Sequence, residues 1–213
     1  NSSDFWINVD FDNSIEDLSN RSAKLIDEFT RQLEARRINY PVLQKWLPTT
    51  SIQWNLGKEN IIASVLEQNG LVYESTRLDI QSSPSFGIDG AGFIKELKID
   101  DLTLDTISLK VRQDSTHMEL QTGVTNKFNG SALSFISSAT VQLHESNASL
   151  LLDFELGGRK MPGLRFGVNV EPKHKGLLFT LIPENPVILF KKFSFMNGKN
   201  KLFLRDDLRL FAE

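Results

Sequence analysis

Apolar residues recur at every second position through most of the chain, and this alternation constrains the fold more than any other feature. Near the C-terminus, Ile188 and Phe190 follow this spacing, and so do Phe193 and Phe195. Successive side chains of a β-strand point to opposite faces, so the alternation predicts strands with one apolar face each. Glycine, proline and asparagine separate these strands at intervals of about 8–12 residues, which favours antiparallel neighbours. The chain is therefore predicted to be mainly β, as an antiparallel meander.

Helical spacing is confined to the N-terminal third. In the range 14–36, apolar residues recur every three or four positions, and Ser14 with Asp17 resembles a capping box, which predicts one longer amphipathic helix. The range 58–70 predicts a second, short helix, and 41–48 predicts a short helical turn. We therefore expect two portions, a strand–helix–strand–helix portion at 1–70 and an antiparallel β portion at 71–213.

Composition excludes several classes of protein. The 24 basic and 27 acidic residues give a formal charge of −3, which has the wrong sign for a protein that binds nucleic acid by neutralising phosphates. The absence of cysteine excludes disulfides and thiolate metal sites. The chain has neither a transmembrane helix nor a signal peptide by pattern, so an exported form is expected to be a mature protein or a fragment.

Catalytic and cofactor motifs are not evident. His117, His144 and His174 are isolated in sequence, which favours turn or surface histidines over a metal site. The glycine-rich segment 87–92 is not followed by a helical pattern, so a β-bend or bulge is expected there rather than a nucleotide loop. Adjacent aspartates at 100–101 point to opposite faces of a strand, which favours a solvated bend. We expect no enzyme activity, no cofactor and no metal.

The apolar face has two interpretations. It could be one leaf of a closed sandwich, or the wall of an open groove that binds an apolar ligand. The chain has 15 Phe against two Tyr and three Trp, so such a face would carry few polar groups. A groove that holds an acyl chain must be apolar along its length, because each buried methylene contributes about 0.8 kcal/mol. An ordinary core meets the same requirement, so periodicity leaves both interpretations open.

A family resemblance adds to this pattern. The segments LTLDTISLKVRQDSTHMELQTGVTN (102–126), LHESNASLLLDFELGG (143–158) and IPENPVILFKKFSFMNGKNKLFLRDDLRLFAE (182–213) carry it, together with 41–70 and GIDGAGFIKEL (87–97). They resemble the translocation and assembly module family TamB, in its Bacteroidetes form, within the AsmA-like group. The resemblance covers most of the chain after about residue 40, and its motifs are patterned rather than catalytic.

The resemblance implies a fold, a location and partners. The implied fold is a meander curled into an elongated open trough with an apolar interior, as an internal segment of a longer, membrane-anchored periplasmic protein. The implied role is the passage of phospholipids between the inner and outer membranes, or help in outer-membrane protein assembly. The implied partners are phospholipid acyl chains and the outer-membrane assembly machinery of the BamA/TamA type. The helix at 14–36 is not part of a simple trough and would plug, flank or cap it.

Alternation and resemblance together nominate the residues that line the lipid path. They are Ile107, Leu109, Val111, Leu120, Leu152, Phe154, Phe166, Val168, Phe179, Leu181, Phe190, Phe193 and Phe195. One rival hypothesis is a binding module that receives unfolded outer-membrane proteins by adding strands at a sheet edge. The other is a closed β-sandwich that acts as a spacer without a ligand.

Overall fold

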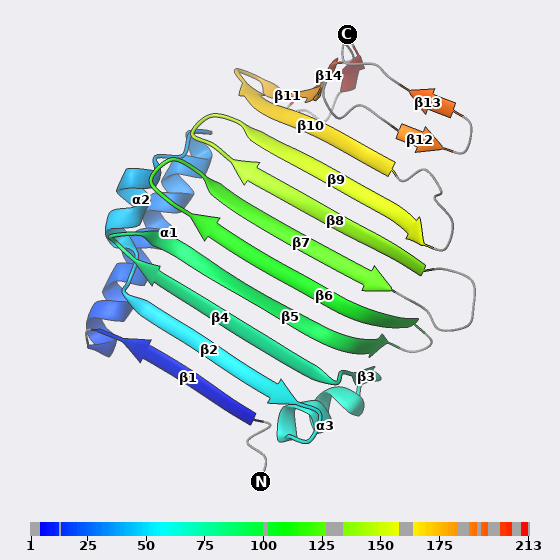
Figure 1. Ribbon diagram of the computed structural model, residues 1–213. Coiled ribbons are helices and arrows are strands. Elements are labelled where there is room, and N and C mark those ends of the chain that lie inside the picture. Colours follow the sequence, from blue (N-terminus) through cyan, green and yellow to red (C-terminus); the bar gives the residue numbers. More distant parts are fainter. Residues whose placement is uncertain are drawn as a thin grey trace.

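The computed structural model describes residues 5–12, 14–99, 102–126, 134–157, 164–182, 188–190, 193–195, 201–205 and 210–212. Within this part of the chain the fold is mainly β, as the alternation predicts. One antiparallel sheet carries every strand, and three helices accompany it (Figure 1).

The strands follow one another across the sheet almost in chain order. The order is β1-β2-β4-β5-β6-β7-β8-β9-β10-β11-β14-β15, with β3 beside β5 and the β12–β13 hairpin beside β10. Their bounds are β1 Phe5–Phe11, β2 Thr50–Gly57, β3 Leu71–Val72, β4 Ser75–Ser83, β5 Gly87–Ile99, β6 Leu102–Gln113, β7 Met118–Asn126, β8 Ser134–Leu143, β9 Ala148–Gly157, β10 Leu164–Lys173, β11 Gly176–Leu181, β12 Ile188–Phe190, β13 Phe193–Phe195, β14 Lys201–Arg205 and β15 Leu210–Ala212. Short hairpins explain this meander, because they can join only antiparallel neighbours.

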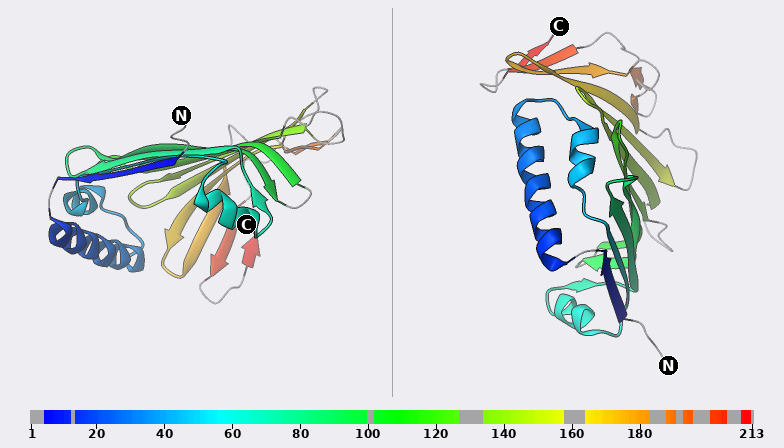
Figure 2. Two further views of the ribbon diagram at one scale, coloured as in Figure 1. Left: turned by 90° about the horizontal axis from the view of Figure 1, so that it is seen from below. Right: turned by 90° about the vertical axis from the view of Figure 1, so that its left-hand side faces the viewer.

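The sheet is curved and open. Figure 2 shows the later strands bending toward the side on which the helices lie, and we call this side the concave face. β1 and β15 stand at opposite ends of the strand order, and the described residues show no pairing between them. The expected trough-like meander is therefore confirmed. The expected division at residue 70 stays a prediction, although β2 pairs with β4 along eight residues and thus joins both portions in one sheet.

The longer predicted helix is α1, Ile15–Glu34. The Ser14 side chain accepts a hydrogen bond from the Asp17 backbone N–H at 3.1 Å, so this residue caps the helix as expected. At the other end, Arg36 lies in the left-handed region with φ 54°. Its N–H donates to the Leu33 carbonyl and the Arg37 N–H donates to the Gln32 carbonyl, which is a Schellman ending with arginine at the usual glycine position.

Two shorter helices follow. The helical turn expected at 41–48 is a helix, α2 (Tyr40–Trp46), with Asn39 as its N-cap. The short helix expected at 58–70 is α3 (Ile61–Glu67), in which Asn60 accepts from the Ala63 N–H at 2.9 Å. All three helices lie on the concave side, with α1 and α2 at one end of the strands and α3 toward the other (Figure 2).

The α1–α2 unit is bound to the tips of successive hairpins. Arg36 donates to the carbonyls of Lys173 and Gly176 at the β10–β11 hairpin, at 3.0 and 3.3 Å. The Ile38 N–H donates to the Glu145 carbonyl at the β8–β9 hairpin at 2.7 Å, and Arg37 pairs with the Glu145 carboxylate. These contacts place both helices across one end of the concave face.

The same unit reaches the β4–β5 hairpin, where Gln44 donates to the Pro84 carbonyl at 3.1 Å. The buried apolar side chains of the described residues concentrate nearby: Tyr40, Leu43 and Leu47 are 3%, 6% and 2% exposed. The largest group of buried apolar residues therefore sits between α2 and the sheet, whereas Leu56 and Tyr73, at 7% and 5% exposure, are buried toward the other end of the strands, near α3.

The glycine-rich segment 87–92 is neither a bend nor a bulge, which corrects the sequence expectation. It lies in β5, whose pairing is unbroken with β4 from Gly87 to Lys95 and with β6 from Ile88 to Lys95. Gly90 is needed because a Cβ there would lie 2.7 Å from Ile80 Cγ1 and 3.0 Å from the Asp79 carbonyl oxygen. The glycine therefore allows the neighbouring strand's side chain to lie across β5.

Candidate lipid-binding face

Strand register decides which side chains share the concave face, because directly paired residues of neighbouring strands point to the same side. Ile88, Met118 and Leu143 line a cavity under α1 and α2, so they identify the concave face. The register then places the following row there, one step further from the helices: Val9, Ile52, Ile80, Gly90, Val111, Leu120, Val141, Leu150, Val168 and Leu181. This row is apolar from β1 to β11.

The residues nominated from sequence fall on this face. The register places ten of the thirteen there: Ile107, Leu109, Val111, Leu120, Leu152, Phe154, Phe166, Val168, Phe179 and Leu181. The backbones of the other three, Phe190, Phe193 and Phe195, form strands β12 and β13, and their side chains lie outside what the structure describes. That these residues contact lipid stays a prediction.

The concave face is only partly covered. Of the ten placed residues, Val168 is buried at 9% exposure, whereas Leu109 is 39% exposed. At the β1 end, Ile7 and Val9 are both 49% exposed. In the described part of the chain no second sheet packs against this face, as a closed sandwich would require. Much of the apolar surface is therefore available to a ligand.

An apolar cavity lies where the helices meet the sheet. Its volume is about 260 Å³, and its lining residues are Leu25, Ile26, Phe29, Ile38, Tyr40, Leu43, Leu47, Ile88, Gln113, Met118 and Leu143. The apolar stripe of α1 borders it without being buried, since Ile26 is 64% and Phe29 is 41% exposed. The helix thus adds apolar surface to the concave face instead of filling it.

A second cleft of about 320 Å³ continues from this cavity, with which it shares Ile38 and Leu143. Leu33, Val170 and Leu177 supply apolar surface, whereas Arg36, Arg37 and His144 lie at its border. The two hollows together form an apolar path along the helix-covered end of the sheet, with Arg36 and the Arg37–Glu145 ion pair at one side.

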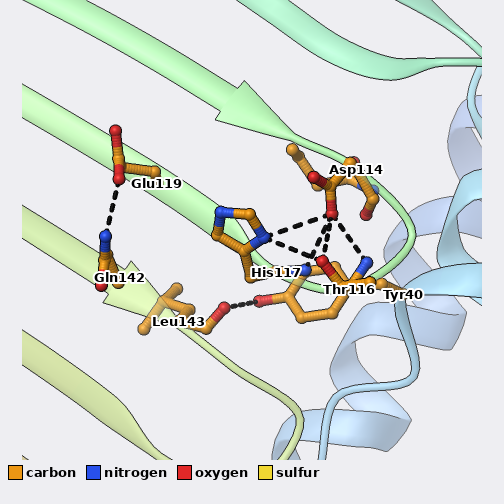
Figure 3. Close-up of polar contacts among 8 residues, drawn as sticks. Tyr40, Asp114, Thr116, His117, Glu119, Gln142 and Leu143 are labelled. Atoms are coloured by element: carbon orange, nitrogen blue, oxygen red, sulfur yellow. Dashed lines mark hydrogen bonds and ion pairs between the residues drawn. The ribbon is translucent and has the colours of Figure 1, made fainter.

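A polar cluster fixes the position of α2 at this end (Figure 3). The Tyr40 hydroxyl donates to the Leu143 carbonyl at 2.7 Å, and burial raises the pKa of Tyr40 to about 12. In the adjacent β6–β7 turn, Asp114 accepts from the Thr116 hydroxyl at 2.6 Å and from its N–H at 2.7 Å. These hydrogen bonds lower the pKa of Asp114 to about 2, and its ionised form holds the turn.

His117 and His144 lie in hairpin turns, as the sequence predicts, although they are close to each other in space. His117 and His144 stack with ring centroids 5.7 Å apart, because the β6–β7 and β8–β9 hairpin tips lie side by side. His117 Nδ1 lies 3.2 Å from the Asp114 carboxylate. Across the residues that the structure describes, no three His, Cys, Asp or Glu side chains form a group that could hold a metal ion. We assign the pair a structural role in the turns.

The opposite face of the sheet is polar. Glu119 accepts from Gln121 and from Gln142 at 2.7 Å each, and Asp153 pairs with Arg165 at 2.6 Å. Figure 3 shows the Glu119–Gln142 pair bridging two strands. A shallow open depression of about 780 Å³ on this side is lined mainly by polar and small residues. Trp6 and Ile136 are exposed apolar exceptions on this side, at 38% and 45% exposure, but only the concave face carries an apolar row that crosses the sheet from β1 to β11.

Sequence reasoning missed part of the concave face. Ile52 and Trp54 on β2, Leu78 on β4 and Phe135 on β8 share it by register, and Phe135 stacks on Phe154 at 5.6 Å. The same alternation could have found them. The Trp54 indole N–H is buried and has no hydrogen-bond partner among the described residues.

No helix in the described part of the chain is both long and apolar enough to cross a membrane. No protein-family model matches the sequence, and neither a curated protein nor a solved structure matches the chain. The site is therefore interpreted from its own geometry.

Proposed function

We propose that this chain binds phospholipid acyl chains along its concave face. The observation that carries the proposal is a row of apolar side chains that crosses the sheet from β1 to β11, on a face that only the helices cover among the residues the structure describes. Contiguous exposed apolar surface of more than a few hundred Å² is rare in proteins without an apolar partner. An acyl chain on such a row would gain about 0.8 kcal/mol per buried methylene.

The biological role follows from the resemblance to the TamB family. As a periplasmic segment of a longer TamB-like protein, the trough would line a path for phospholipids between the inner and outer membranes, or aid outer-membrane protein assembly. No catalytic chemistry is needed for this role, and the proposal includes none. The Arg36 guanidinium, which lines the cleft beside the Arg37–Glu145 ion pair, suits the phosphate side of a lipid that enters the cleft.

Lipid co-purification tests the proposal. Phe166→Asp places a charge on the concave face of β10, whereas Asn169→Asp places the same charge on its opposite face. Organic extraction followed by mass spectrometry should recover phospholipid from the wild-type protein and from Asn169→Asp, and much less from Phe166→Asp. Equal lipid in both variants, with unchanged circular dichroism, would contradict the proposal.

One observation favours a second candidate, the strand-adding module for unfolded outer-membrane proteins. β1 lies at the margin of the sheet and pairs only with β2 among the described residues. Crosslinking from β1 to a client protein, without lipid on the concave face, would favour this candidate over lipid binding.

A further inference from the structure

The segment that leads from α1 into α2 contacts hairpin tips in the order in which they follow one another across the sheet. Arg36 donates to two carbonyls of the β10–β11 hairpin at 3.0 and 3.3 Å. The Ile38 N–H donates to the Glu145 carbonyl of the β8–β9 hairpin at 2.7 Å. Gln44 donates to the Pro84 carbonyl of the β4–β5 hairpin at 3.1 Å. We call residues 36–44 the strap.

The remaining hairpin at this end of the sheet, β6–β7, lies beside the middle of the strap. Asn39 and Pro41 line a small hollow together with Ser115 and Thr116 of this hairpin. The Tyr40 hydroxyl, from the same part of the strap, donates to the carbonyl at the end of β8 at 2.7 Å. One short segment therefore meets four successive hairpins, and it does so from the concave side (Figure 2).

The strand ladders do not themselves account for the bend of the sheet. A β-bulge sets two residues opposite one and bends its strand. Every strand pair from β4–β5 to β10–β11 keeps one register along its described length, so none of these ladders contains a bulge. The twist between plain neighbouring strands varies from pair to pair. Backbone pairing therefore leaves the curvature adjustable, and contacts outside the ladders can set it.

We propose that the strap sets the curvature of the sheet, because it holds the tips of four hairpins at fixed places along one short segment. Arg36 is the decisive residue. It binds the β10–β11 hairpin, which belongs to the part of the sheet that bends toward the helices (Figure 2). Its hydrogen bonds come from a charged guanidinium, and such bonds are stronger than those between neutral groups. When they are lost, β10 and β11 move away from the helices and the concave face widens.

This inference goes beyond lipid binding. The strap acts through contacts within the chain, so its effect on the sheet requires no ligand. Its failure would leave the lipid proposal unaffected, since the apolar row stays on the concave face whatever sets the curvature. If both proposals hold, Arg36 controls the width of the face on which the acyl chain lies.

Double electron–electron resonance between two spin labels measures the curvature, and the chain has no cysteine that would take up a label elsewhere. Gln81→Cys in β4 and Asn169→Cys in β10 carry the labels. Both residues are exposed, and they lie in one cross-strand row on the polar face. Six strand spacings separate them, which is about 29 Å in a flat sheet. Curvature spreads labels on the outer side apart, so the distance with an intact strap should exceed this value.

Arg36→Gly in the labelled chain releases the β10–β11 hairpin, and glycine accepts the left-handed backbone at this position. The mean distance should shorten toward about 29 Å, and its distribution should broaden. Arg31→Ala is the matched control, because Arg31 pairs with Glu28 inside α1, and it should leave the distance unchanged.

An unchanged distance in Arg36→Gly, or equal shortening in Arg31→Ala, would overturn the proposal, since the strands' own twist and glycines would then set the curvature. Circular dichroism checks that each variant is folded. If Arg36→Gly does not fold, Arg36→Asn carries the same test, because asparagine also adopts the left-handed conformation and is too short to reach the hairpin.

Discussion

A single charge in the middle of the concave face should weaken lipid binding without unfolding the sheet. Leu109 lies on this face in β6, between Gly92 of β5 and Thr122 of β7. It is 39% exposed, so an aspartate there can keep most of its hydration. The cost in stability should therefore stay near that of an ordinary partly exposed substitution, about 1 kcal/mol.

The magnitude of the binding loss follows from the strand spacing. Neighbouring strands lie about 4.8 Å apart, so an extended acyl chain that crosses the strands rests about four methylenes on each of them. A hydrated carboxylate at position 109 would keep these methylenes in contact with water, and the acyl chain would lose about 0.8 kcal/mol of binding free energy for each of them. The total, about 3.2 kcal/mol, corresponds to a roughly 200-fold larger dissociation constant.

The matched control changes the adjacent residue on the other face. Ser108→Asp places the same charge one position away, on the polar side of β6. Titration of both variants with a fluorescent phospholipid, with circular dichroism as the folding control, measures the difference. If Leu109→Asp and Ser108→Asp bind the lipid equally well, the lipid is not on the concave face and the reasoning fails.

Three further predictions concern the framework of the face. Arg36→Ala should lower the free energy of unfolding, measured in urea, by about 1 kcal/mol more than Arg36→Gly does. Both variants lose the hydrogen bonds to the β10–β11 hairpin, but only alanine retains the strain of a non-glycine residue in the left-handed region. Equal losses of stability would contradict a strained helix cap. The neutral form of Tyr40 should contribute stability that is complete below about pH 10 and is lost as the pH rises to about 12, because its folded pKa is raised to about 12. Tyrosinate absorbance of a Tyr73→Phe variant checks this, and ionisation near pH 10 would refute it. Gly90→Ala should cost about 1–3 kcal/mol in the same unfolding assay, because the added Cβ lies 2.7 Å from Ile80 Cγ1. Ile80→Ala should recover part of that loss, and additive effects would contradict the clash.

Alternation predicted the strands, their apolar face and the facing of ten nominated residues. It could do so because a period-2 pattern is local: side chains two residues apart in a strand point to the same side, and the register then aligns these sides between strands. Phe179 and Phe166, for example, are 13 residues apart and still share one face by this rule. The cap at Ser14 was predictable for the same reason, since it depends on residues within one turn.

Long-range docking could not be read from sequence. Arg36 binds carbonyls 137 and 140 positions away, and Tyr40 binds a carbonyl 103 positions away. The acceptors are backbone carbonyl oxygens, which every residue has, so no residue type in the sequence marks them. The stacking of His117 and His144 depends on two hairpin tips that the meander places together. The segment 87–92 looked like a bend because glycine has a flexible backbone. In the structure, Gly90 is needed for another reason, because it leaves room for the Ile80 side chain of the neighbouring strand.

Tryptophan quenching by brominated acyl chains tests the central claim most directly. The chain has three tryptophans, and β-strand register places Trp54 on the concave face and Trp6 on the opposite one. Two variants, each with Trp46→Phe and one of these two residues also replaced by Phe, report on the faces separately. Phospholipids brominated along the acyl chain should quench Trp54 strongly and Trp6 weakly. Equal quenching of both residues, or quenching of Trp6 alone, would contradict an acyl chain bound on the concave face.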